Sequence, residues 1–244
     1  GEVTTIAGTG SAGSLDGTGT AASFNGPTSV AIDINGNVIV ADQGNHKIRV
    51  IDTGGEVTTL AGSGTPGSSD GNGANSSFNL PTGLAIDGSN NSIYVTDLFN
   101  QKIRKIDSEG NVSTVAGSGS SGSLDGNGTE ASFNFPVGIV LDAEGSIYVA
   151  DAFNHLIRKI NSDNNVTTLA GTGIAGFVDG NGSSASFNTP TGLVLDPLGN
   201  LFVIDQNNHS IRKIISNGDV STIVGSGSAG DADGDGITAE FNQP

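Results

Sequence analysis

The segment DGTGTAASFNGP at residues 16–27 is the first of five near-copies along the chain. The later copies are DGNGANSSFNLP (70–81), DGNGTEASFNFP (125–136), DGNGSSASFNTP (179–190) and DGDGITAEFNQP (233–244). Their phenylalanines recur every 54 or 55 residues, at Phe24, Phe78, Phe133, Phe187 and Phe241. A fixed period of this length is typical of repeat architectures, in which each unit is too small to bury its apolar side alone.

The residues between two such segments predict four short strands. In the second copy the first three are PTGLAID (81–87), SIYVTD (92–97) and QKIRKID (101–107). The fourth is exemplified by VTTLAG (57–62), which is rich in the β-branched residues that strands favour. Turns of the Asp/Asn/Gly type, such as DINGN at 33–37, separate the strands and predict hairpins. No segment has the 3.6-residue periodicity of an amphipathic helix.

Four antiparallel strands repeated at this period predict an all-β fold, a β-propeller built of four-stranded blades. The segment at 16–27 and its copies then cross from the outer strand of one blade to the inner strand of the next. Their glycines permit positive φ, and their proline fixes φ at the entry of the inner strand. Their phenylalanine is the one large apolar group and is expected to fill the space between neighbouring blades.

The third strand carries a family motif. GNHKIRVID (44–52) resembles the NHL repeat, whose motif Asn-His-x-Ile-Arg recurs at 154–158 and 208–212. The copy at 100–104 departs from it, because Gln101 replaces the histidine. The resemblance covers essentially the whole chain. It implies a β-propeller, usually six-bladed in that family, and most often a binding or scaffolding module.

We interpret residues 1–244 as a single propeller region. Its successive blades are expected at 27–80, 81–135, 136–189 and 190–244. Residues 1–26 match residues 218–244 and are expected to be a surplus outer strand with its crossing loop. Three interpretations of this surplus stay open: a fragment of a longer array or ring, an open four-blade fold with the N-terminal strand on an edge, or blade edges that pair with another molecule.

The composition excludes several classes of partner. A formal net charge of −16 argues against nucleic acid and anionic lipid surfaces. No run of 18 apolar residues occurs, so no membrane insertion is expected. Cysteine is absent, which excludes disulfides, thiol catalysis and thiolate metal sites. Together with the absence of methionine and tryptophan, this favours an extracellular or cell-surface location, where oxidisable side chains are a liability.

Two sets of repeated polar residues are interpreted as architectural. The arginine of each third strand is expected to pair with the aspartate that ends the preceding strand, in a half-exposed ion pair that fixes the hairpin register. These pairs are Asp42 with Arg49, Asp97 with Arg104, Asp151 with Arg158, and Asp205 with Arg212. The histidines His46, His155 and His209 begin the third strands and are interpreted as turn residues rather than metal ligands.

The last crossing segment carries additional acids. Asp231, Asp233 and Asp235 alternate before Gly236, as at the start of an EF-hand calcium loop, with Glu240 as a further ligand. The fit is partial, because the twelfth position of the loop is Asn242 instead of glutamate. The sequence therefore predicts a weak surface Ca²⁺ site here, no metal site in the other copies, and no other cofactor.

No catalytic motif is found, and the repeats are too uniform for an asymmetric active site. We therefore expect no catalytic residues. The predicted function is a non-catalytic extracellular structural or interaction module with protein partners, self-assembling into a filament or surface stalk by blade-edge pairing or strand exchange. The first alternative is a propeller that binds carbohydrate, peptide or calcium through its top-face loops, and the second is a lyase or hydrolase with an axial metal. The sequence does not identify the ligand.

Overall fold

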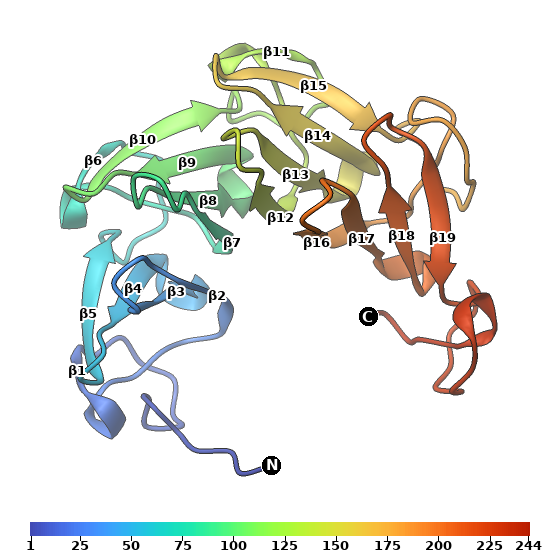
Figure 1. The fold of residues 1–244 in the computed structure, drawn as a ribbon. Coiled ribbons are helices and arrows are strands. Elements are labelled where there is room, and N and C mark those ends of the chain that lie inside the picture. Colours follow the sequence, from blue (N-terminus) through green and yellow to red (C-terminus); the bar gives the residue numbers. More distant parts are fainter. The chain divides into compact units, whose positions relative to one another are not determined.

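The computed structural model describes residues 1–244 and contains only β-strands, turns and short 3-10 helices (Figure 1). Four antiparallel sheets follow one another along the chain, which confirms the all-β propeller-type fold. The chain divides into two compact units, Gly1–Val115 and Ala116–Pro244, which are described separately below. None of the helices is long and apolar enough to cross a membrane.

The first unit holds two sheets. The first sheet has the order β1-β5-β4-β3-β2 and the second the order β6-β10-β9-β8-β7. The strands of the first sheet are β1 (Gly17–Thr18), β2 (Pro27–Ile32), β3 (Val38–Asp42), β4 (Lys47–Ile51) and β5 (Glu56–Ala61). Those of the second are β6 (Gly71–Asn72), β7 (Pro81–Ile86), β8 (Ile93–Asp97), β9 (Lys102–Ile106) and β10 (Asn111–Ala116).

The second unit repeats this arrangement. The third sheet has the order β11-β15-β14-β13-β12, and the fourth has the order β16-β17-β18-β19. The strands of the third sheet are β11 (Gly126–Asn127), β12 (Pro136–Leu141), β13 (Ile147–Asp151), β14 (Leu156–Ile160) and β15 (Asn165–Ala170). Those of the fourth are β16 (Pro190–Leu195), β17 (Leu201–Asp205), β18 (Ser210–Ile214) and β19 (Val220–Val224).

The four-stranded meander is confirmed in every sheet, but the blades are not purely four-stranded. The glycines that open each crossing segment form a further two-residue strand on the outer edge of the following sheet. In the first sheet, Gly17 of β1 pairs with Val57 and Thr18 pairs with Glu56. In the fourth sheet this strand shrinks to a bridge between Gly180 and Val220. Each crossing segment is thus hydrogen-bonded to the sheet that follows it.

The surplus N-terminal strand expected in residues 1–26 is not formed as a regular strand. Residues 1–8 have no strand assignment, and the side chains of Val3 and Ile6 are exposed. A strand needs a hydrogen-bonded neighbour, and the equivalent β5 finds it in β4. β4 is thereby already occupied, so the region before Gly8 has no free edge in the first sheet.

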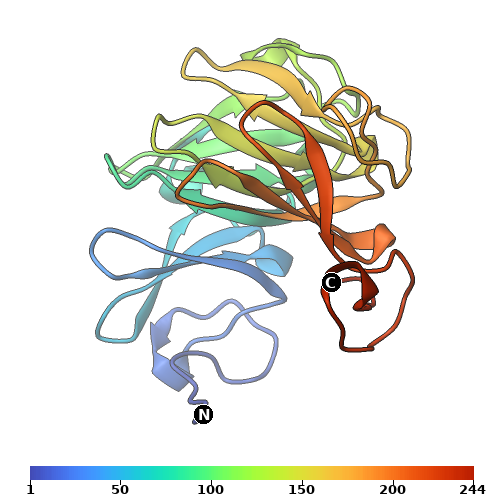
Figure 2. The ribbon, with the colours of Figure 1, turned by 45° about the vertical axis from the view of Figure 1, so that its right-hand side comes forward.

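Apolar side chains gather between successive sheets within each unit. In the first unit, Ile39 and Ile48 of the first sheet pack with Val95 and Ile106 of the second, and Phe78 of the crossing segment completes the cluster. In the second unit, Ala150 and Ile157 pack with Leu201 and Val203 around Phe187. Figure 2 shows the same meander in each sheet from a second side, with the segment after β19 projecting as an open loop.

The repeated phenylalanines differ in burial. Phe78, Phe133 and Phe187 are fully buried, so the crossing-segment phenylalanine does fill the interior. Phe24 and Phe241, in the first and last copies, are half-buried.

Candidate functional site

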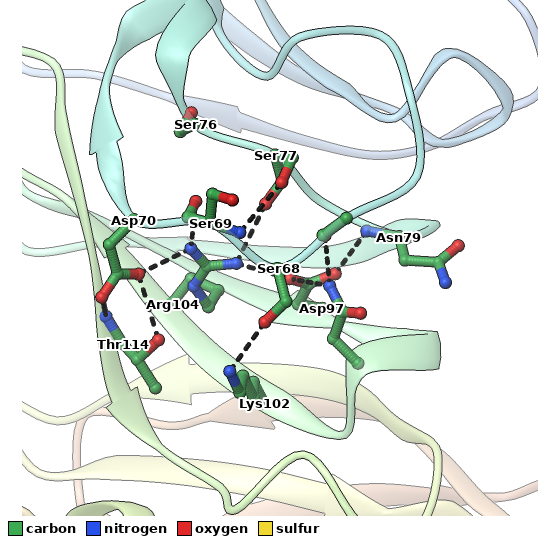
Figure 3. Close-up of polar contacts among 12 residues, drawn as sticks. Ser68, Ser69, Asp70, Ser76, Ser77, Asn79, Asp97, Lys102, Arg104 and Thr114 are labelled. Atoms are coloured by element: carbon green, nitrogen blue, oxygen red, sulfur yellow. Dashed lines mark hydrogen bonds and ion pairs between the residues drawn. The ribbon is translucent and has the colours of Figure 1, made fainter.

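The recurring polar centre of the molecule is an arginine held between two aspartates, shown for the second sheet in Figure 3. Arg104 lies on β9, Asp97 ends β8, and Asp70 opens the crossing segment. Arg104 Nη1 lies 2.7 Å from Asp97 Oδ2, and Nη2 lies 2.7 Å from Asp70 Oδ1. The same two nitrogens donate to the carbonyl oxygens of Ser77 and Ser69, at 3.1 and 2.9 Å. One guanidinium therefore fastens the crossing segment to the hairpin.

Three further donors complete this site. Asn100 Nδ2 donates to Asp97 Oδ2 at 2.8 Å and to the carbonyl of Gly67 at 2.6 Å. The backbone N–H of Asn79 donates to Asp97 Oδ1 at 2.7 Å. Thr114 of β10 donates to Asp70 through its hydroxyl, at 3.1 Å, and through its backbone N–H. The aspartates accept from several donors each, as buried carboxylates require.

The same site occurs once in every sheet, which makes it a property of the repeat. Each arginine lies 2.6–2.8 Å from an inner and an outer aspartate. The four sets are Asp42–Arg49–Asp16, Asp97–Arg104–Asp70, Asp151–Arg158–Asp125 and Asp205–Arg212–Asp179. A β-bulge beside Arg49, Arg158 and Arg212 shifts the register at this point of the third strand, and bulges of this kind re-aim side chains.

Burial distinguishes these ion pairs from the half-exposed pairs that the sequence predicts. The side chains of Arg104 and Asp97 are fully buried, whereas that of Asp70 is half exposed. Burial raises the pKa of the Asp97 carboxyl, although hydrogen bonds from Asn100 and Asn79 and the charge of Arg104 lower it. Desolvation of two charges is costly, so the pair stabilises the fold only as long as both partners are present.

An aromatic ring covers each guanidinium. Arg104 Cζ lies 5.3 Å from the ring centroid of Phe78, and Arg49 Cζ lies 5.2 Å from that of Phe24. Desolvated cation–π contacts of this kind are favourable. The Nε atoms of all four arginines are buried without a hydrogen-bond partner. With its guanidinium enclosed by carboxylates, carbonyls and a ring, the site is suited to holding chain segments together rather than to contacting a substrate.

The histidines lie at the start of the third strands, at positive φ, and do not converge. His46 Nδ1 accepts a hydrogen bond from the backbone N–H of Leu80 at 3.1 Å, and His155 Nδ1 accepts one from Thr189 at 3.1 Å. His209 Nδ1 accepts one from Gln243 at 3.0 Å. Because Nδ1 is an acceptor in each case, the ring is neutral with its proton on Nε2. Gln101 takes the same backbone conformation in the second copy.

The predicted Ca²⁺ site is not assembled. The structure contains no group of three His, Cys, Asp or Glu side chains that could hold a metal ion. Asp231, Asp233 and Asp235 are exposed. Glu240 occupies the place of Ser23 in the first copy, and its side chain lies over Gly230 as that of Ser23 lies over Gly13. The alternating acids therefore fail as calcium ligands because Glu240 is used as a local packing residue.

Two cavities differ in character, and both lie in the second unit. One, of about 250 Å³, is apolar and is lined by Gly192, Val194, Phe202, Ile204 and Ile211 on the fourth sheet. The other, of about 410 Å³, is polar and is lined by hydroxyl, amide and glycine residues of β15 and the neighbouring turns. Sequence patterns did not identify either cavity, because both are formed by residues distant along the chain.

Comparisons with known proteins agree with this description. The family described as "Teneurin NHL domain" matches residues 9–123, and the family described as "NHL repeat" matches residues 133–160 and 187–214. Protein SUPPRESSOR OF QUENCHING 1, chloroplastic, of Arabidopsis thaliana is 33% identical over 91% of this chain and 23% of its own length. NHL repeat-containing protein 2 of Homo sapiens is 33% identical over 89% of this chain and 35% of its own length. The chain thus spans about a quarter to a third of these relatives.

Solved structures show the same fold at lower sequence identity. An auxiliary nutrient binding protein from Bacteroides ovatus matches 93% of this chain and 53% of its own, with a TM-score of 0.66 and 19% identity. A streptogramin B lyase matches 82% of this chain and 55% of its own, with a TM-score of 0.58 and 17% identity. The repeated Asn-His-x-Ile-Arg strands, their sheets and the matched families together show that the chain belongs to the NHL-repeat family of β-propellers.

Proposed function

We propose that this chain is a non-catalytic protein-interaction module that associates with further copies of itself. The observation that carries the proposal is an uncovered apolar face on the first sheet. The side chains of Val30 and Ile32 on β2 are 66% and 70% exposed. Their equivalents in the second sheet, Leu84 and Ile86, pack against the first sheet.

The fourth sheet supports the same proposal from the opposite side. Ile204 and Ile211 stand in the positions of Ala41 and Ile48, which are fully buried against the second sheet. In the fourth sheet these positions line the apolar cavity, together with Val194, which is 58% exposed. Apolar patches of this kind mark sites of protein interaction.

The experiment is to measure molar mass by light scattering over a wide range of protein concentration. Self-association predicts a mass that rises with concentration above the 24.2 kDa of one chain. A constant mass of one chain up to the highest soluble concentration would remove the self-association part of the proposal.

The absence of catalysis is part of the proposal, and the fold likeness to a lyase makes it worth testing. The recurring arginine is enclosed and identical in all four sheets, which gives no distinct pocket for a reaction. Incubation of the protein with a streptogramin B antibiotic and Mg²⁺ is expected to leave the antibiotic intact. Cleavage that depends on the protein would overturn this point.

An extracellular or cell-surface location also belongs to the proposal. A chain without cysteine, methionine or tryptophan offers few side chains to oxidation, which suits an oxidising environment. Cell fractionation with an antibody against the native protein tests this. Recovery of the protein in the cytosolic fraction alone would contradict it.

A second candidate function is ligand binding by the polar cavity of about 410 Å³. Thr168, Asn181, Ser183 and Asn217 line it, and their hydroxyl and amide groups are suited to hydrogen-bond a carbohydrate. Binding to the native state would raise the melting temperature of the protein. A glycan array followed by thermal melting tests this function. An array without a hit would remove this candidate and leave self-association untouched.

A further inference from the structure

We propose that residues 226–244, called here the acceptor segment, dock on the first sheet of a second copy of this chain and replace that copy's own residues 9–27. This inference rests on the proposed self-association and names the contact that produces it. The occupant is a second copy because its first sheet carries the arginine, the strand edge and the apolar face that the acceptor segment and the fourth sheet lack.

The acceptor segment already has the conformation of a docked crossing segment. Gly225 N–H donates to the carbonyl of Gly236 at 3.1 Å, as Gly8 does to Gly19. Gly230 N–H donates to the carbonyl of Phe241 at 3.0 Å, as Gly13 does to Phe24. The 3-10 turn Gly236–Thr238 repeats the turn Gly19–Ala21. Little ordering is therefore required on docking, which favours association.

What the acceptor segment lacks is its arginine. In every earlier copy the equivalent aspartate accepts from an arginine and from a threonine of the following sheet, as Asp16 does from Arg49 and Thr59. Asp233 is exposed and makes no ion pair in the structure. Phe241 has no guanidinium over its ring, whereas Phe24 has that of Arg49. The missing partner is thus an Arg-bearing third strand beside a free outer edge.

The apolar faces add a second, larger contact of the same symmetry. Leu84 and Ile86 of the second sheet pack against the side of the first sheet that carries Ala41 and Ile48. Val30 and Ile32 repeat the first pair, and Ile204 and Ile211 repeat the second. When the acceptor segment of one copy occupies the outer edge of another copy's first sheet, these faces meet in the relation that already joins the first and second sheets. Such a contact is heterologous and propagates from copy to copy.

Two features set the conditions for docking. The chain's own residues 9–27 compete at a high effective concentration, because they are covalently attached to the same sheet. In the docked state Asp235 takes the place of Thr18 and faces Glu56, and like charges directly opposite one another are destabilising. Docking is therefore expected at high protein concentration and is expected to strengthen with added salt, which screens this repulsion.

The test uses disulfide trapping in the full chain, which has no native cysteine. Thr18 and Glu56 are directly paired, so their Cα atoms lie at a separation that a disulfide spans. We would mix one sample carrying Glu56→Cys with another carrying Asp235→Cys and oxidise at high concentration and high salt. The expected result is a disulfide-linked dimer that contains one chain of each kind. If only dimers of like chains form, the inference is wrong.

Two controls separate this contact from other modes of association. The variant Thr18→Cys/Glu56→Cys locks the chain's own segment in place, so its oxidised form is expected to lose self-association and its reduced form to regain it. Asp233→Asn is expected to weaken self-association about tenfold, because a charge-assisted hydrogen bond is lost. Asp125→Asn changes an internal copy of the same site and is expected to leave self-association unchanged.

The outcomes distinguish this inference from the broader proposal. If the wild type associates but the mixed cysteine samples do not cross-link and Asp233→Asn has no effect, self-association stands and segment exchange is overturned. If the wild type stays a monomer at every concentration, both are overturned.

Discussion

At the scale of single residues, the arginine of the third strand holds the repeat together. Arg104 satisfies two aspartates and two carbonyl groups at once, and a phenylalanine ring covers it. The planar guanidinium, with its several donors in fixed directions, can make all these bonds, whereas a lysine ammonium cannot. This explains why the same residue type stands at this position in all four sheets.

Arg104→Ala is expected to lower the free energy of unfolding by about 3–5 kcal/mol, because it leaves the buried Asp97 without its counter-charge. Urea denaturation monitored by circular dichroism measures this loss. Lys105→Ala on the same strand removes a cation that lies 5.7 Å from the Tyr94 ring and is expected to cost less than about 1 kcal/mol. Equal losses in both variants would contradict the role assigned to Arg104.

His155 gives the stability a pH dependence. Its pKa is lowered, mainly because burial disfavours the charged ring, while Asp205 opposes the shift. As the pH falls, the unfolded chain therefore takes up the proton first. The stability from this residue is complete above a pH of about 6.5 and declines as the pH falls toward the lowered pKa.

His155→Gln copies the residue found at Gln101 and is expected to remove this contribution while keeping the backbone conformation. The measurement is the difference in melting temperature between pH 7.5 and pH 5 for both proteins. The wild type is expected to lose more stability than the variant over this interval. An equal or greater loss in the variant would show that His155 does not titrate as described.

The sequence predicts part of this site and not the rest. The pairing of Asp97 with Arg104 could be inferred because the two residues are close along the chain and recur together. The partnership with Asp70 could not, because 34 residues separate it from Arg104 and an Asp-Gly pair is fully explained as a turn. Burial could not be inferred either, because it depends on Phe78 and on carbonyl groups from the crossing segment.

At the scale of elements, the meander follows from alternation and turn residues, whereas its edges do not. The strands β7, β8, β9 and β10 agree with the predicted segments because their apolar residues and flanking turns are local signals. β6 has only two residues, Gly71 and Asn72, and a pair of this composition carries no strand signal. The strand expected before Gly8 failed for the reverse reason: a suitable composition found no free neighbouring edge.

The junction between the fourth strand and the crossing segment depends on a glycine. Gly171 has φ of 110°, and a Cβ there would lie 2.6 Å from the carbonyl oxygen of His155. Gly171→Ala is expected to cost about 2 kcal/mol or more, from backbone strain and overlap together. Gly88→Ala has open space around it and an ordinary φ, so it is expected to be neutral or slightly stabilising. Thermal melting compares the two, and a neutral Gly171→Ala would contradict the tight junction.

At the scale of the whole molecule, the repeats bury one another's apolar faces, and the faces without a neighbour determine how the protein associates. The fold class could be predicted from the period alone, since a unit that cannot cover its own face must stack with its copies. The exposure of Val30, Ile32 and Val194 could not be predicted, because the same residue types are buried in the inner copies. The predicted calcium site failed because composition says nothing about whether carboxylates converge.

The most direct measurement is sedimentation equilibrium of the wild type and the variant Val30→Asp, with Val3→Asp as the control for added charge. Val3 is 96% exposed and lies outside the sheets. The account predicts that the wild type and Val3→Asp associate with rising concentration, whereas Val30→Asp stays at 24.2 kDa with an unchanged melting temperature. A wild type that remains monomeric, or a Val30→Asp variant that associates as strongly as the wild type, would contradict it.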